Sequence, residues 1–139
     1  ELLIVLAVIA ALIATITPVA LNAIRKAQAT KVAQNIKTLA SSFENYLYVE
    51  GSDGLAKITS INDLGRDVDE TKYGLAYTNT SGDFTVYVWT IEDVDETTVK
   101  NAVSDISTGT IDLTNYETLT DSVSSGNLTF YYEYEFVVY

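Results

Sequence analysis

The sequence predicts an α+β protein in which one long, apolar N-terminal α-helix packs against a small antiparallel β-sheet. Residues 2–24 carry no ionised side chain, and a helical pattern of apolar residues continues from them to about residue 50. The remaining residues alternate between β-branched or aromatic segments and turn-forming residues. We therefore expect an apolar helix at 1–24, its amphipathic continuation at 25–50, and an acidic α+β head at 51–139.

The segment 2–24 is long enough to cross a membrane as a helix. At about 1.5 Å per residue it spans roughly 35 Å, against about 30 Å for the hydrocarbon core of a bilayer. Cleavable signal peptides begin with basic residues and have a shorter apolar stretch. This segment instead begins with Glu1, and its helical pattern continues beyond it. We expect a retained helix that lies in lipid or among other helices.

Small residues and one proline mark this segment. Alanines recur at spacings of three and four, which lets another helix approach closely; they are Ala7, Ala10, Ala11 and Ala14. Pro18 removes one backbone hydrogen bond, and its ring opposes the carbonyl of Ala14. Two outcomes remain open, namely local unwinding around residues 14–18 or a mild bend in a continuous helix.

The continuation at 25–50 has one apolar row for the head to cover. Its members follow one another at steps of four, three, four and four residues: Val32, Ile36, Leu39, Phe43 and Leu47. Gly51 follows in a polar stretch and suits a left-handed helix cap.

The head contains signals for both strands and a helix. Residues 55–72 suit a loop, and strand-like residues 73–78 and 83–91 flank a hairpin connection at 79–82. Asp93 suits the N-cap of a helix, with Glu96 in the capping-box position. The buried face of that helix would hold Val99, Ala102, Val103 and Ile106. One face of a final strand would hold Leu128, Phe130, Tyr132, Tyr134, Phe136 and Val138.

Composition argues against several kinds of chemistry. The net charge of −11 is divided into +3 over residues 1–40 and −14 over residues 41–139, so the head repels nucleic acid phosphates and anionic lipid. The chain has no Cys and no His, which excludes disulfides, thiol nucleophiles and the commonest proton shuttle and metal ligand. No phosphate-binding loop or nucleophile elbow is present. We expect no enzyme activity.

Calcium is the one cofactor that the acidic residues would suit, because hard oxygen ligands favour Ca²⁺. The candidate ligands are Asp63, Asp67, Asp69 and Glu70, which lack the EF-hand spacing. A second group at 93–96 is better explained as the start of a helix, where the macrodipole favours carboxylates.

Residues 1–18, ELLIVLAVIAALIATITP, resemble the N-terminal signature of bacterial type IV pilins and of the related pseudopilins of type II secretion systems. Glu1 and Pro18 stand at the family's separation, and the resemblance covers roughly the first 30 residues. The head resembles the family only in architecture, the pilin fold of a long helix followed by a small sheet. Ala10 departs from the glycine of many members, and the family's C-terminal cysteine pair is absent.

The resemblance implies a subunit of a type IV pilus. In the family the mature chain begins four residues before the glutamate with an N-methylated aromatic residue, so we expect four residues to precede Glu1. The precursor would lie in the inner membrane, be trimmed by prepilin peptidase and be drawn by the pilus assembly machinery into an extracellular helical filament of identical subunits. That filament would serve adhesion, motility or DNA uptake, and only DNA uptake would make nucleic acid a partner.

The resemblance also implies roles for individual residues. Glu1 would neutralise the N-terminal amine of a neighbouring subunit, within a filament core built from the helices that carry Ala7, Ala10, Ala14 and Pro18. A buried carboxylate is costly when unpaired and tolerable beside an ammonium group, which agrees with this role. The alternative is a terminal carboxylate that reaches water without a partner.

Two other functions remain open. A pseudopilin of a type II secretion system would share the helix and the head. An unrelated single-span membrane anchor that carries an acidic ligand-binding head would share the composition but would stay a monomer in detergent.

Overall fold

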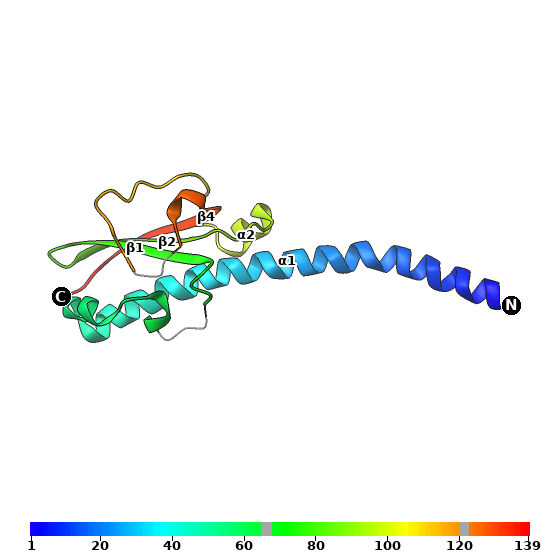
Figure 1. Ribbon diagram of the computed structural model, residues 1–139, viewed down its shortest axis with the longest axis horizontal. Helices are drawn as coiled ribbons and strands as arrows, with labels where there is room; N and C mark the ends of the chain where they lie inside the picture. The colour runs from blue at the N-terminus through cyan, green and yellow to red at the C-terminus, as the bar shows by residue number, and fades with distance from the viewer. Residues whose placement is uncertain (65–67, 120–122) are drawn as a thin grey trace.

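The molecule consists of one long helix and a head that packs along the second half of that helix (Figure 1). The computed structural model describes residues 1–64, 68–119 and 123–139. The helix, α1 (Leu2–Glu50), extends beyond the head at its N-terminal end, and the head places an antiparallel sheet over its C-terminal half. The predicted α+β class is confirmed.

α1 is continuous through Pro18 and curves gently along its length (Figure 1). Thr15 Oγ1 donates to the Leu12 carbonyl at 2.9 Å. Thr17 Oγ1 donates to the Ile13 carbonyl at 2.8 Å. Both hydroxyls are therefore satisfied by carbonyls about one turn earlier, which bends helices without unwinding them. Of the two outcomes left open for residues 14–18, the structure has the continuous helix.

The second half of α1 buries the predicted row of apolar residues. All five members are buried: Val32, Ile36, Leu39, Phe43 and Leu47. Ala29, Ala33 and Ala40 are buried beside them and let the sheet approach the helix closely. The helix ends at Glu50, where the N–H of Gly51 donates to the Leu47 carbonyl at 2.8 Å.

The cap at Gly51 differs in one respect from the prediction. Its φ of 71° is the positive value expected of a capping glycine, but its ψ of −178° lies outside the left-handed helical region. The chain therefore leaves α1 in an extended direction. It then forms two short 3₁₀-helices, Ser52–Lys57 and Ile61–Leu64, where the sequence predicted only a loop.

Four antiparallel strands form the sheet, in the order β3-β1-β2-β4. The two central strands are β1 (Tyr73–Thr80) and β2 (Asp83–Thr90), and the edges are β3 (Glu117–Thr118) and β4 (Phe130–Val137). The β1–β2 hairpin and the final strand were predicted and are confirmed. β3 was not predicted, because two exposed polar residues carry no strand pattern of their own.

The β1–β2 connection is tighter than the predicted span of 79–82. Only Ser81 and Gly82 lie outside the strands, with φ values of 57° and 100°. Two successive positive φ values are those of a type I′ turn, whose twist matches the flanking strands. Asn79 Oδ1 accepts a hydrogen bond from the Gly82 N–H at 2.9 Å and closes the turn.

The core between α1 and the sheet is centred on phenylalanine rings. Phe84 and Phe136, on neighbouring strands, stack with their centroids 5.1 Å apart and their planes at 7°. Phe43 of α1 meets both edge-on, at 6.5 and 6.3 Å, and is fully buried. Edge-to-face and offset contacts of this kind contribute about 0.5–1.5 kcal/mol each beyond burial.

The short helix α2 (Glu96–Ala102) begins later than predicted. Its N-cap is Asp95, not Asp93, and the Asp95 carboxylate accepts from the Thr98 N–H at 2.9 Å. The physical reason is Val94, which packs against the core and holds the preceding backbone outside the helix. Of the predicted buried face, only Val99 is buried on the helix itself, because α2 ends at Ala102, which is exposed. Val103 is the C-cap and is half-buried, and Ile106 is buried but lies beyond the helix.

The outer face of the sheet, away from α1, contains Trp89, the only tryptophan of the sequence. Trp89 is buried, and its Nε1 donates to the Val123 carbonyl at 3.0 Å. A Cβ added to Gly74 on β1 would lie 2.3 Å from two ring atoms of Trp89. The indole therefore lies directly on the Gly74 backbone.

Replacing Phe43 by Ala should lower the free energy of unfolding of the head by about 3–5 kcal/mol, because it leaves a cavity among the rings. Denaturant unfolding of the full chain in detergent micelles, followed by tryptophan fluorescence, would measure it. Val49→Ala is the matched control on the same helix, since Val49 is exposed and its loss should change stability by at most about 0.5 kcal/mol. Equal effects of the two changes would contradict this core.

Gly74→Ala should displace the Trp89 ring, because no side chain fits between the ring and the β1 backbone. We expect a red shift of the tryptophan emission and destabilisation of about 1–3 kcal/mol. Gly126→Ala is the control, since its added Cβ would meet only the Ser124 hydroxyl, at 3.5 Å. An unchanged emission spectrum for Gly74→Ala would contradict the packing of Trp89.

Candidate functional site

The largest exposed apolar surface of the chain is the first half of α1. Every large apolar residue from Leu2 to Ile24 keeps between 47% and 80% of its surface exposed. The segment is long and apolar enough to cross a membrane, and its most hydrophobic 18-residue window has no buried residue. A membrane anchor and a signal segment both have this composition, and here the segment continues without a break into the part of α1 that packs on the head.

The predicted assembly residues all lie on this exposed segment. Ala7, Ala10 and Ala14 lie on one continuous helix at spacings that place them on the same side of it. Pro18 lies one turn further along the same helix. Glu1 stands at the N-cap, is exposed, and makes no side-chain hydrogen bond to the helix. The structure thus places all five residues on the exposed part of one helix, with Glu1 at its end and not on the side that carries the alanines.

A basic segment follows the apolar one on α1 and consists of Arg25, Lys26 and Lys31. All three are exposed, and none makes an ion pair or a hydrogen bond with the described residues. Lys37, six residues further along α1, differs because its Nζ donates to the Tyr132 hydroxyl at 2.9 Å and lies 4.2 Å from that ring's centroid. Lys26 interacts electrostatically with Asp95, beside which Arg25 also lies, but no close ion pair with the described residues occupies the basic segment.

The lysines of the head behave differently, since each described one is paired. Lys57 pairs with Glu50, Lys100 with Glu96, and Lys72 with Glu92 at 3.0 Å. Surface pairs of this kind stabilise by about 0–1 kcal/mol each. Among the described residues, the basic side chains without an ion pair therefore all lie on α1, in the basic segment and at Lys37.

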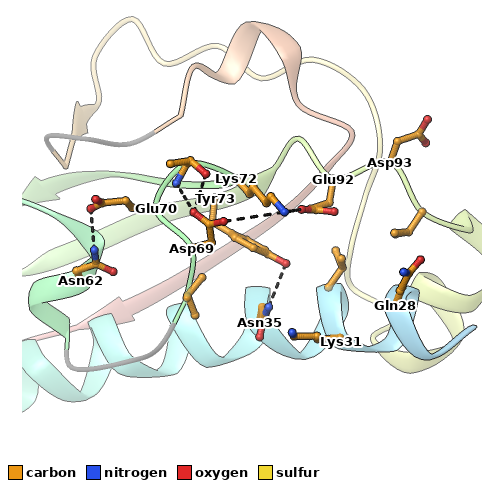
Figure 2. A pocket seen from close by; sticks show the side chains of 14 residues that line it. Gln28, Lys31, Asn35, Asn62, Asp69, Glu70, Lys72, Tyr73, Glu92 and Asp93 are labelled. Atoms are coloured by element: carbon orange, nitrogen blue, oxygen red, sulfur yellow. Dashed lines mark hydrogen bonds and ion pairs between the residues drawn. The ribbon is translucent and has the colours of Figure 1, made fainter. Parts of the chain in front are cut away.

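A polar cleft of about 700 Å³ lies where α1, Asn62, residues 68–73 and the loop after β2 meet (Figure 2). Asn35 of α1 donates through its Nδ2 to the Tyr73 hydroxyl at 3.1 Å across its floor. Lys72 lies between Glu92, at 3.0 Å, and Asp69, at 4.0 Å (Figure 2). The sequence analysis singled out two lining residues, Asp69 and Glu70, as calcium ligands, but it could not predict the cleft itself, because its residues come from segments that are distant in the chain.

The predicted calcium ligands are engaged locally in the described residues. Asp63 accepts from the N–H groups of Thr59 and Ser60, at 2.7 and 3.0 Å. Asp69 accepts from Thr71, and Glu70 accepts from Asn62 at 2.8 Å. Asp67 lies outside the described residues.

No group of three acidic side chains that could hold a metal ion comes together within 1–64, 68–119 and 123–139. The Lys72 ammonium already occupies a position between two carboxylates of the cleft. Calcium binding by Asp63, Asp67, Asp69 and Glu70 stays a prediction.

Several aspartates act as caps of turns, which shifts their pKa values. Backbone hydrogen bonds from Thr59 and Ser60 lower the pKa of Asp63. Hydrogen bonds from the Thr98 hydroxyl and backbone lower the pKa of Asp95 in the same way. These carboxylates are ionised at neutral pH and serve the local structure.

The tyrosines of the core serve packing and hydrogen bonding. The Tyr134 hydroxyl donates to the Ala40 carbonyl at 2.8 Å, and burial raises its pKa. Burial and the neighbouring Glu117 raise the pKa of Tyr77 to about 12. Both phenols stay protonated at physiological pH.

No protein-family model, curated protein or solved structure matches the chain.

Acidification should destabilise the head below about pH 4. A carboxylate whose pKa is lower in the folded state than in the unfolded one stabilises the fold above the unfolded value, near 3.9, and loses that contribution as the pH falls through the folded value. Asp63 is such a group. The midpoint of thermal unfolding in detergent micelles, measured by circular dichroism from pH 6 to pH 2.5, should therefore fall less steeply for Asp63→Asn than for the unsubstituted chain.

Asp53→Asn is the control for this comparison, because the Asp53 side chain makes no hydrogen bond to the described residues. It should retain the full acid dependence. The same slope for Asp63→Asn and Asp53→Asn would refute the role given to Asp63.

Proposed function

We propose that the chain is a structural subunit of the type IV pilin class, which polymerises through the first half of α1 into an extracellular helical filament. The observation that carries this proposal is the unbroken helix, whose bare apolar half continues directly into the half that forms the core of the head. A head joined to its apolar segment by a rigid rod has a fixed orientation, so neighbouring heads repeat in register when the rods pack together. The resemblance of residues 1–18 to the pilin signature supports the same function.

The free energy of transferring the apolar helix from lipid to a helical bundle is consistent with a polymer that assembles from subunits in the membrane. When about 20 apolar side chains leave lipid for other helices, the hydrophobic contribution roughly cancels, because both surroundings are apolar. Close packing at small residues such as Ala7, Ala10 and Ala14 must then supply the attraction between helices. The precursor would lie in the inner membrane until prepilin peptidase and the assembly machinery act on it.

Glu1 would give this packing its register. A carboxylate moved into a bundle of apolar helices costs several kcal/mol if it remains charged and unpaired. Pairing with the N-terminal amine of a neighbouring subunit offsets that cost only at the correct stagger of the two helices. The Glu1 side chain makes no hydrogen bond or ion pair with the described residues, which suits a role between subunits.

A pseudopilin of a type II secretion system is the second candidate, because it would use the same helix and the same head. Electron microscopy of fibres sheared from cells separates the two. Abundant long fibres that contain this chain support the pilus subunit, and short or absent fibres support the pseudopilin.

Glu1→Gln should reduce filament yield by about tenfold or more, which corresponds to about 1.4 kcal/mol for each added subunit. The head should be unchanged, since Glu1 lies at the far end of α1 from it (Figure 1). Sedimentation and negative-stain microscopy after removal of detergent measure the yield, and circular dichroism reports the fold.

Glu135→Gln is the matched control, since it removes one exposed carboxylate from β4 and should leave assembly intact. Normal filaments from Glu1→Gln would rule out the pairing of Glu1. An unsubstituted chain that stays a monomer after detergent removal would instead support the single-span anchor and overturn the proposed function.

A further inference from the structure

The exposed apolar side chains of the head gather at one end of the molecule. Outside residues 2–24, the large apolar residues that remain most exposed in the described parts of the chain are Tyr48, Val49, Val137 and Tyr139. They come from the end of α1 and from the end of β4 with the residues after it, and both lie at the end opposite the N-terminus (Figure 1). We call these four residues the tip.

Tyr48 anchors the tip to the core beneath it. Val49 is 81% exposed and Tyr48 53% exposed, although both belong to the last turns of α1. The Tyr48 ring meets the buried Phe136 edge-on at 5.7 Å. A preformed apolar surface loses little conformational entropy on binding, which is typical of protein interfaces.

Acidic residues surround the tip. Glu44 lies one turn before Tyr48 on α1 and interacts with its hydroxyl, Glu50 ends the helix, and Asp53 follows it. The only described base nearby is Lys57, which pairs with Glu50. The tip is therefore an apolar surface with an acidic border.

The basic segment of α1 has the complementary properties. Arg25, Lys26 and Lys31 form no ion pair with the described residues, although Asp95 lies near Lys26, and the exposed apolar residues Leu21 and Ile24 adjoin them. An apolar surface with a basic border matches an apolar surface with an acidic border in both respects.

One chain cannot close this contact on itself. From Ala27, in the middle of the basic segment, to Val49 the helix rises about 33 Å, since each residue adds about 1.5 Å. The two surfaces lie on one continuous helix and are fixed at that separation. A contact between them must join two copies.

We infer that the tip of one copy docks on the basic segment of the next copy along the filament. This inference rests on the proposed function. A contact between two different surfaces of the same chain propagates without closing when the rotation between copies does not close a ring, as a helical filament requires. The same contact would reduce electrostatic repulsion between subunits, because heads with a net charge of −14 over residues 41–139 repel one another unless positive charge lies between them.

Cysteine cross-linking tests the inference directly, because the chain has no cysteine of its own. Ala27 and Val49 are both exposed, and replacing both by Cys keeps side chains of similar size and leaves every charge in place. A disulfide needs Cα atoms within about 7 Å, so this pair cannot form one within a single copy. Filaments of Ala27→Cys/Val49→Cys should give a ladder of covalent multimers on mild oxidation, and the same protein dispersed in detergent should give none.

The single variants and a second pair are the controls. Ala27→Cys and Val49→Cys alone should give no multimers, and Thr85→Cys/Val49→Cys should give no ladder, because Thr85 lies on β2, away from the basic segment. Dimers from Val49→Cys alone would show tip-to-tip pairing and overturn the inference. Filaments of the double variant that give no ladder would overturn it while leaving the proposed function standing, whereas an unsubstituted chain that forms no filaments would overturn both.

Charge reversal gives a second measurement that does not depend on cysteine. Lys26→Glu/Lys31→Glu should reduce filament yield after detergent removal by about tenfold or more. Adding Glu50→Lys/Asp53→Lys to the same chain restores opposite charges across the contact and should recover most of the yield. A fourfold variant that assembles no better than Lys26→Glu/Lys31→Glu would overturn the inference.

Discussion

The continuity of α1 is the constraint on which the rest of the structure depends. One helix meets two surroundings, since its first half exposes apolar side chains all round and its second half forms the floor of the head's core. Pro18 bends it without interrupting it, because the neighbouring threonine hydroxyls bond within the helix. The head therefore inherits its orientation from the apolar half, which a flexible linker would not provide.

The head is built as a stiff body, and its polar groups mostly serve that purpose. Aspartates such as Asp63 and Asp95 cap turns, and the Tyr134 hydroxyl ties β4 to the backbone of α1. Phe43 locks the helix against the two stacked rings of the sheet. In the proposed filament such a head would suit a repeating subunit, because errors in the position of each copy would add up along the filament.

Charge is distributed unevenly along each copy, with a basic segment on α1 and an acidic head. The described lysines of the head form ion pairs, whereas Arg25, Lys26 and Lys31 form none with the described residues, although Lys26 interacts electrostatically with Asp95. Acidic heads that lie side by side repel one another. Two copies attract when one is shifted along the helix axis, because the acidic head of one copy then faces the basic segment of the other. The arrangement thus favours one relative placement of neighbours over others.

The sequence by itself determined the elements whose periodicity is long or strongly alternating. The row from Val32 to Leu47, the β1–β2 hairpin and the buried face of β4 follow from patterns of hydrophobicity, because burial on one face imposes a period. Short elements could not be predicted in this way. Glu117–Thr118 becomes a strand only because β1 has an open edge beside it, and α2 begins at Asp95 because the core captures Val94.

Tertiary structure alone decided which surfaces come together. The sequence predicted that Ala7, Ala10, Ala11 and Ala14 share one side of a helix, since a helix fixes the placement of residues a few positions apart. The polar cleft and the tip each combine residues far apart in the chain, as Tyr48 and Val137 illustrate. Such combinations depend on the strand order and on where α1 ends relative to β4, and no local pattern encodes either.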